Sequence, residues 1–109
     1  MAYDEALAAR IRTRIGDHPA LTEREMFGGI AFMIGGNMAV GVHGDDLMVR
    51  VGKAGHDAAV ARPGARIMDF TARPMVGWIT VTREGFADDS DLDTWVDLGV
   101  TFAGSLAAK

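Results

Sequence analysis

Apolar residues along this chain repeat with two different periods, and the period predicts which segments are helices and which are strands. In residues 3–15 and 92–106 they recur about every four positions, which places them on one side of a helix. Glycine and proline in residues 16–19 end the first helix. Ser90 is the predicted N-cap of the last helix, and Trp95 is predicted to lie in the core.

Residues 23–34, 38–42 and 47–51 alternate with a period of two, which is typical of strands. The separators, residues 35–37 and 43–46, are short and rich in residues that tolerate positive φ, as hairpin turns are. The three segments therefore predict an antiparallel meander.

The second half of the chain predicts one more short helix and two more strands. The helix is an alanine-rich segment at residues 53–61, and the strands are residues 66–70 and 78–82. The element order is then α-β-β-β-α-β-β-α, an α+β fold of two layers with an antiparallel sheet covered by helices on one face. Because no linker or internal repeat interrupts it, we expect residues 1–109 to form one domain.

The composition is that of a globular protein from a reducing compartment. The 109 residues are 49% hydrophobic and 24% charged, and none is cysteine, which excludes disulfides, thiolate nucleophiles and cysteine zinc sites. The chain begins without a basic segment followed by an apolar one, and its apolar runs are too short to span a bilayer. We therefore expect a cytoplasmic protein without a membrane partner.

The charge disfavours nucleic acid as a partner. With 11 Lys and Arg against 15 Asp and Glu, the formal net charge is −4, which opposes the counterion release that drives nonspecific binding to DNA. The basic run of Arg10, Arg12 and Arg14 and the acidic run at residues 88–93 are interpreted as solvated helix faces or ends. We expect no direct nucleic-acid binding.

The residues that most often carry catalysis or bind metals lack the necessary spacing. His18, His43 and His56 show no metal-binding pattern, so we interpret them as surface or turn histidines. Ser90 and Ser105 lie outside any nucleophile motif, and the glycine pairs lack the spacing of a phosphate-binding loop. We therefore expect no enzyme activity, no cofactor and no metal.

Arg50 lies among apolar neighbours in a predicted interior strand and cannot lose its charge. The favoured interpretation is a structural ion pair, for which the candidate carboxylates are Glu23, Glu25 and Asp69. The alternative is an anion site shared with Arg24 and Lys53.

Gly28 and Gly29 interrupt the first predicted strand. Glycine inside a strand is typical of a bulge or bend, so the favoured interpretation is a bend that lets one long strand curve, and the alternative is a contact surface. The candidate surface for a ligand or partner comprises Arg24, Phe27, Gly28, Gly29, Arg50 and Lys53.

The predicted strands are apolar on both faces, although helices cover only one face of a two-layer sheet. If the helices cover the side of Ile30, Phe32 and Ile34, an apolar patch is left exposed on the other side. Soluble monomers rarely tolerate a large patch of this kind, so a symmetric homodimer is predicted. Its candidate surface comprises Met33, Met48 and Trp78.

A set of short segments spread along nearly the whole chain carries a family resemblance. The segments are residues 26–33, 36–38, 47–52, 62–65, 68–70, 73–78 and 92–96. Together they resemble the N-terminal domain of the TfoX/Sxy family of competence regulators. The resemblance implies a two-layer α+β fold and an association with competence genes. Full-length members carry a further C-terminal helical domain, and because this chain ends at Lys109 we expect a stand-alone N-terminal domain.

The resemblance brings no catalytic residues with it. The leading hypothesis is therefore a non-catalytic regulatory or protein-interaction module with a protein partner, linked to the regulation of competence genes. The alternatives are a small-molecule or anion-binding domain and an enzyme whose site follows no recognisable motif.

Overall fold

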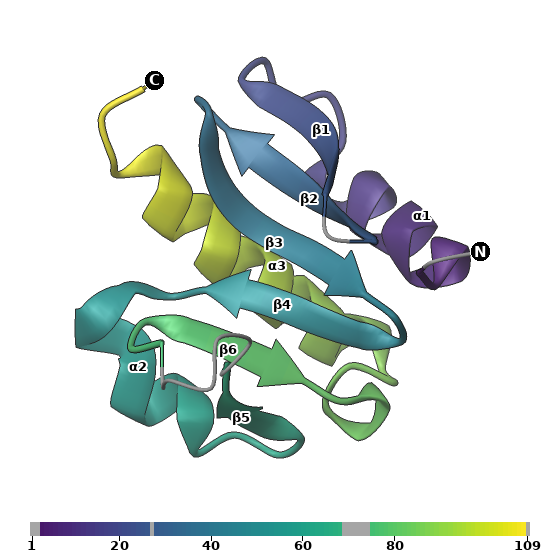
Figure 1. Cartoon of the computed structure of the whole chain (residues 1–109), viewed down its shortest axis with the longest axis vertical. Coiled ribbons are helices and arrows are strands. Elements are labelled where there is room, and N and C mark those ends of the chain that lie inside the picture. The colour runs from purple at the N-terminus through teal and green to yellow at the C-terminus, as the bar shows by residue number, and fades with distance from the viewer. Residues whose placement is uncertain (1–2, 27, 69–74, 109) are drawn as a thin grey trace.

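The computed structural model describes residues 3–26, 28–68 and 75–108 and shows three α-helices on a six-stranded antiparallel sheet (Figure 1). The helices are α1 (Glu5–Ile15), α2 (Gly52–Val60) and α3 (Asp89–Gly104), with a 3-10 turn at Arg83–Gly85. The strands are β1 (Leu21–Met26), β2 (Gly29–Ile34), β3 (Asn37–His43), β4 (Asp46–Arg50), β5 (Ala65–Ile67) and β6 (Trp78–Val81). Their order across the sheet is β1-β2-β3-β4-β6-β5, which confirms the predicted α+β class.

The segment predicted as one curved strand is in fact a hairpin. β1 pairs antiparallel with β2, and Met26 lies opposite Gly29, so the chain reverses direction between them. Gly28 has a φ of 75°, which glycine adopts without strain. A Cβ on Gly29 would collide with the carbonyl oxygen of Val42 in β3. The prediction of a bend was therefore wrong: one glycine permits the turn and the other permits close approach of the next strand.

The ends of the helices follow from local hydrogen bonds and backbone angles. The carboxylate of Asp4 accepts a hydrogen bond from the backbone N–H of Leu7 at 3.1 Å and caps α1, which ends at Gly16 with a φ of 65°. The predicted N-cap of α3 was wrong, because α3 begins after Asp88 and Ser90 lies inside its first turn. None of the described helices is both long and apolar enough to cross a bilayer.

The helices cover the face of the sheet that carries Phe32, which is the arrangement on which the predicted dimer surface was conditional. Leu7 of α1, Ala59 of α2 and Trp95 of α3 belong to one buried cluster with Phe32 and the apolar side chains of β3, β4 and β6. In Figure 1 α3 lies behind β3 and β4, so the viewer looks at the opposite face of the sheet. Trp95 is 1% exposed, as expected for a core residue.

Helix and sheet approach each other closely where α3 crosses a bulge in β3. Phe32 pairs with Val40 but the next residue, Met33, pairs with Met38, so Ala39 is an extra residue in β3. Gly99 of α3 lies over this bulge. A Cβ at Gly99 would collide with the carbonyl oxygen of Ala39 and lie 2.7 Å from Cγ1 of Val40. Glycine is therefore required at this crossing.

Two alanine substitutions in α3 separate close packing from helix propensity. We expect Gly99→Ala to lower the free energy of unfolding by about 1–3 kcal/mol, because the added methyl group overpacks the crossing. Gly104→Ala is the control: open space surrounds that position, so alanine should be neutral or stabilising by up to about 1 kcal/mol. Urea denaturation of both variants measures the difference. Equal effects of the two substitutions would contradict the close crossing.

Candidate functional site

The junction between β4 and α2 is held against the residues that precede β6. The backbone N–H groups of Val51 and Gly52 both donate to the carbonyl oxygen of Gly77, at 2.8 and 3.1 Å. Gly52 and Gly77 have φ values of 77° and 91°. A Cβ on Gly77 would lie 3.0 Å from the carbonyl carbon of Gly52. The two backbones therefore meet at a distance that glycine permits.

The buried side chain of His56 in α2 also binds the backbone at this junction. It is 7% exposed, and its Nδ1 accepts a hydrogen bond from the backbone N–H of Gly77 at 2.9 Å. The imidazole nitrogen thus satisfies a backbone donor that no solvent reaches. The interpretation of His56 as a surface histidine was wrong. His18 does serve a turn, since its Nδ1 accepts from the N–H of Ala20 at 3.1 Å.

Arg50, the last residue of β4, lies close to two aromatic rings. Its guanidinium carbon is 4.9 Å from the ring centroid of Trp78, its partner in β6, and 5.4 Å from that of Phe102 in α3. Phe102 reaches this position because Gly52 has no side chain: a Cβ there would lie 2.8 Å from Cδ1 of the ring. We call these three residues the arginine clamp: Arg50 of β4, Trp78 of β6 and Phe102 of α3.

The predicted ion pair of Arg50 was wrong for the carboxylates that the structure describes. Glu23 instead pairs with Arg12 of α1 at 2.8 Å, and this hydrogen bond raises the pKa of Arg12. Glu25 lies within 3.5 Å of a tyrosine hydroxyl that donates to it. Asp69 lies outside the described residues.

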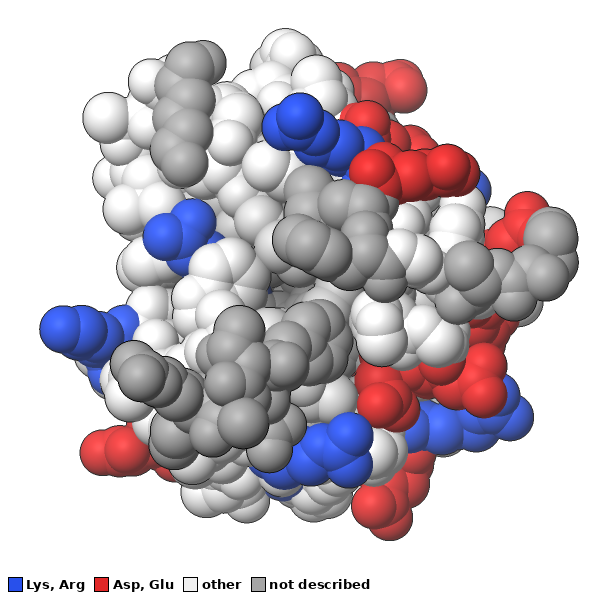
Figure 2. Space-filling model, in the orientation of Figure 1, with Lys and Arg blue, Asp and Glu red and all other residues white. Residues whose placement is uncertain are grey.

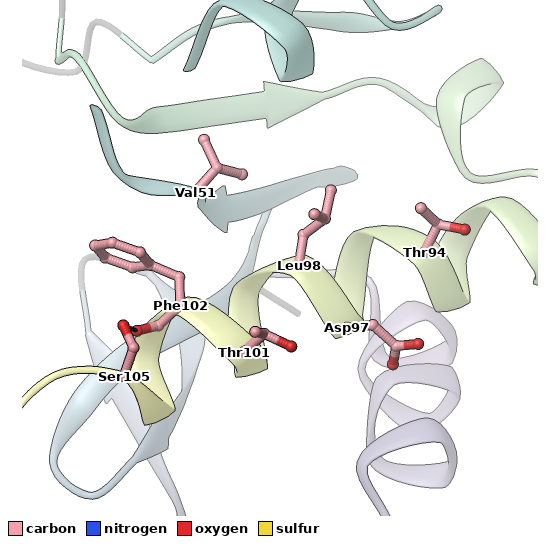
Figure 3. Close-up of a pocket in the computed structure, with 7 residues that line it drawn as sticks. All are labelled: Val51, Thr94, Asp97, Leu98, Thr101, Phe102 and Ser105. Carbon is pink, nitrogen blue, oxygen red and sulfur yellow. Dashed lines mark hydrogen bonds between the residues drawn. The ribbon is translucent and has the colours of Figure 1, made fainter. Parts of the chain in front are cut away.

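A groove follows the exposed side of α3 beside the arginine clamp (Figure 3). Its volume is about 500 Å³, and Val51, Thr94, Asp97, Leu98, Thr101, Phe102 and Ser105 line it. In Figure 3 Leu98 and Phe102 extend from α3 toward the end of β4, where Val51 closes the apolar side. Leu98 is 39% exposed. We call this feature the α3 groove.

The residues of the candidate ligand surface do not form one site. Arg24 lies on β1 at the edge of the sheet, three strands from β4, so the sheet does not bring it to Arg50. Gly28 and Gly29 belong to the β1–β2 hairpin, and Phe27 lies outside the described residues. Lys53 is exposed in the first turn of α2 and thus adjoins the arginine clamp along the chain.

The candidate dimer surface is less exposed than the sequence suggested. Met48 is 8% exposed and therefore buried, whereas Met33 and Trp78 are half-buried. The expectation that all three form an exposed patch was wrong for Met48. The homodimer stays a prediction. The large apolar residues that are exposed in the described part of the chain are Ile67, Val76 and Leu98.

The basic run of α1 faces the acidic residues of α3, a pairing that sequence analysis missed. Arg10 binds Asp89 at 3.0 Å, and Arg14 binds Asp97 at 2.6 Å, a hydrogen bond that raises the pKa of Arg14. About 80 residues separate these partners along the chain, so no local spacing could reveal them. On the face seen in Figure 2, the described lysines and arginines are scattered and form no continuous basic surface.

Two observations concern the polar side chains that could take part in chemistry. Among them, no group of three His, Asp or Glu side chains could hold a metal ion. The hydroxyl of Ser105 in the α3 groove donates to the carbonyl oxygen of Phe102 at 2.6 Å, so its hydrogen bond goes to the backbone rather than to a base. The groove thus presents apolar and hydroxyl surface together with the carboxylate of Asp97, which is bound to Arg14.

Comparison with known proteins gives one match. Residues 14–103 match the family described as the TfoX N-terminal domain, which spans α1 from Arg14 through most of α3. No protein of curated function and no solved structure matches the chain.

Substitution of His56 tests the junction. We expect His56→Ala to lower the free energy of unfolding by about 1–3 kcal/mol, because it leaves the buried N–H of Gly77 without an acceptor. Asp57→Ala, at the exposed neighbouring position of α2, is the control and should change stability by less than about 0.5 kcal/mol. Chemical denaturation provides the measurement. If both variants unfold at the parent midpoint, the His56–Gly77 hydrogen bond does not support the junction.

Proposed function

This chain belongs to the TfoX N-terminal domain family, and from that premise we propose that it is a non-catalytic, regulatory protein-interaction module that binds its partner in the α3 groove. The family supports the regulatory part of the proposal, through the association with competence genes that the resemblance implies. The observation that carries the interaction part is the exposure of Leu98 in a groove that Val51 and Phe102 also line.

The shape of the α3 groove favours a protein segment over an enclosed small molecule. Pockets for small molecules bury most of their ligand's surface. Here Asp97, Leu98, Thr101 and Ser105 are themselves exposed, so the groove is open along one side of α3. Its apolar side chains are flanked by hydroxyl groups, which suits a partner segment with apolar anchors and hydrogen-bonding neighbours.

The pairing of α1 with α3 supports the view that nucleic acid is not a direct partner. A DNA-binding surface needs cationic side chains that are free to replace counterions at phosphates. Arg10, Arg12 and Arg14 are the clustered arginines of α1, and each is already bound to a carboxylate. Binding DNA would require breaking these pairs in a protein whose formal net charge is −4.

A groove variant and a matched surface variant test the interaction. The partner is first identified by cross-linking to the chain in its source cells and is then purified. Calorimetry measures its affinity for the parent chain and for the variants Leu98→Glu and Val76→Glu. Leu98→Glu should weaken binding by about tenfold or more, since it places a charge in the apolar part of the groove. Val76→Glu should bind like the parent, because Val76 is 55% exposed but lies outside the groove. Equal affinities of the two variants would rule out the groove as the contact surface.

A mobility-shift titration tests the proposal that nucleic acid is not a direct partner. The purified chain should leave arbitrary duplex DNA unshifted at micromolar concentration and low salt, because its α1 arginines are paired. The same titration with Asp89→Asn and Asp97→Asn controls for the pairing. A parent protein that binds DNA with steep salt dependence would contradict the proposal.

A further inference from the structure

The arginine clamp places the guanidinium of Arg50 against two aromatic rings. A guanidinium is planar, and its two faces stack on aromatic rings while its five N–H donors point outward in the plane. Trp78 and Phe102 lie 4.9 and 5.4 Å from the guanidinium carbon of Arg50. Because three elements of the fold supply the clamp, the side chain is held in place before any ligand arrives.

The N–H donors of Arg50 have no acceptor among the described residues. In the described part of the chain Arg50 contacts two aromatic rings. No hydrogen bond or ion pair joins its guanidinium to an oxygen of a described residue. Among the described residues, Arg24 and Arg62 also have no carboxylate within 4.0 Å, and Arg62 likewise lies over an aromatic ring, that of Trp95. The remaining described arginines behave differently. Those with a carboxylate within 4.0 Å are Arg10, Arg12, Arg14, Arg66 and Arg83. Arg50 is half-buried, so its N–H groups can reach a ligand from solvent.

The surroundings of the clamp add positive charge. Lys53 is exposed three residues after Arg50, and the first turn of α2 contains no acidic residue. Asp97, which lines the neighbouring groove, is already bound to Arg14. In a chain with a formal net charge of −4, the β4–α2 junction therefore carries two cations, Arg50 and Lys53, that form no ion pair with a described carboxylate. The nearest acidic residue along α2 is Asp57, one turn after Lys53.

We propose that the edge of Arg50 is a binding site for an oxyanion, namely a carboxylate or phosphate group of a ligand. Two parallel N–H···O hydrogen bonds from Arg50 would hold it, and Lys53 would contribute a point charge. The stacked rings reduce the side-chain entropy lost on binding. This site goes beyond the proposed function, since the α3 groove could bind its partner without it.

Amide and arginine-side-chain NMR spectra of the whole chain test the proposal. Sodium phosphate and sodium acetate are titrated separately, with sodium chloride holding the ionic strength constant. The proteins are the parent, Arg50→Gln, Arg50→Lys and the control Arg24→Gln, an exposed arginine three strands away. We expect saturable shifts of the Arg50 Nε–H and the Lys53 amide in the parent and in Arg24→Gln. Tighter saturation by phosphate or by acetate identifies which of the two groups the site prefers.

The Arg50 variants distinguish hydrogen bonding by the planar guanidinium from attraction by a positive charge alone. Arg50→Gln should lose the saturable shift at Lys53, and Arg50→Lys, which keeps the charge but not the planar fork, should weaken it by about tenfold. Arg50→Lys carries the comparison if Arg50→Gln does not fold. Shifts in the parent that rise linearly with both anions, or that persist unchanged in Arg50→Lys, would overturn the proposal.

Discussion

The contact between Gly99 and the bulge of β3 is the constraint on which the rest of the structure depends. It fixes the height of α3 above the sheet, because the helix backbone meets the carbonyl oxygen of Ala39 directly. Trp95, one turn earlier, then lies in the core with its Nε1 donating to the carbonyl oxygen of Gly85 at 3.1 Å. Phe102, almost one turn later, reaches Gly52 and Arg50. The core, the clamp and the groove are thus set by one crossing.

Periodicity in the sequence was sufficient to predict the helices and the fold class, because both depend on residues near one another in the chain. It left open which face of the sheet the helices cover. The alternating side chains Ile30 and Phe32 do face the helices. The hairpin at Gly28 was missed for a physical reason. Residues 22–25 of β1 are polar and exposed at the sheet edge, so no apolar alternation distinguished that strand from the next.

The site could not be predicted in the same way, because its parts meet only in the folded chain. Arg50 was recognised as unusual from its apolar neighbours, yet its aromatic partners lie 28 and 52 residues further along the chain. His56 acts through a glycine backbone, which leaves no side-chain pattern to detect. The family match agrees with the fold that the sequence predicted. The clamp and the α3 groove, in contrast, are formed by the packing of distant segments.

Native-state hydrogen exchange tests the central role of the α3–β3 crossing most directly, because it reports the free energy at which each segment opens. If the crossing holds the domain together, the amides around Gly99 and those of β3 exchange only through global unfolding, with the free energy obtained from denaturation. Exchange of the central α3 amides at a clearly lower free energy, while β2 and β3 stay protected, would show that α3 detaches from an intact sheet and would contradict this account.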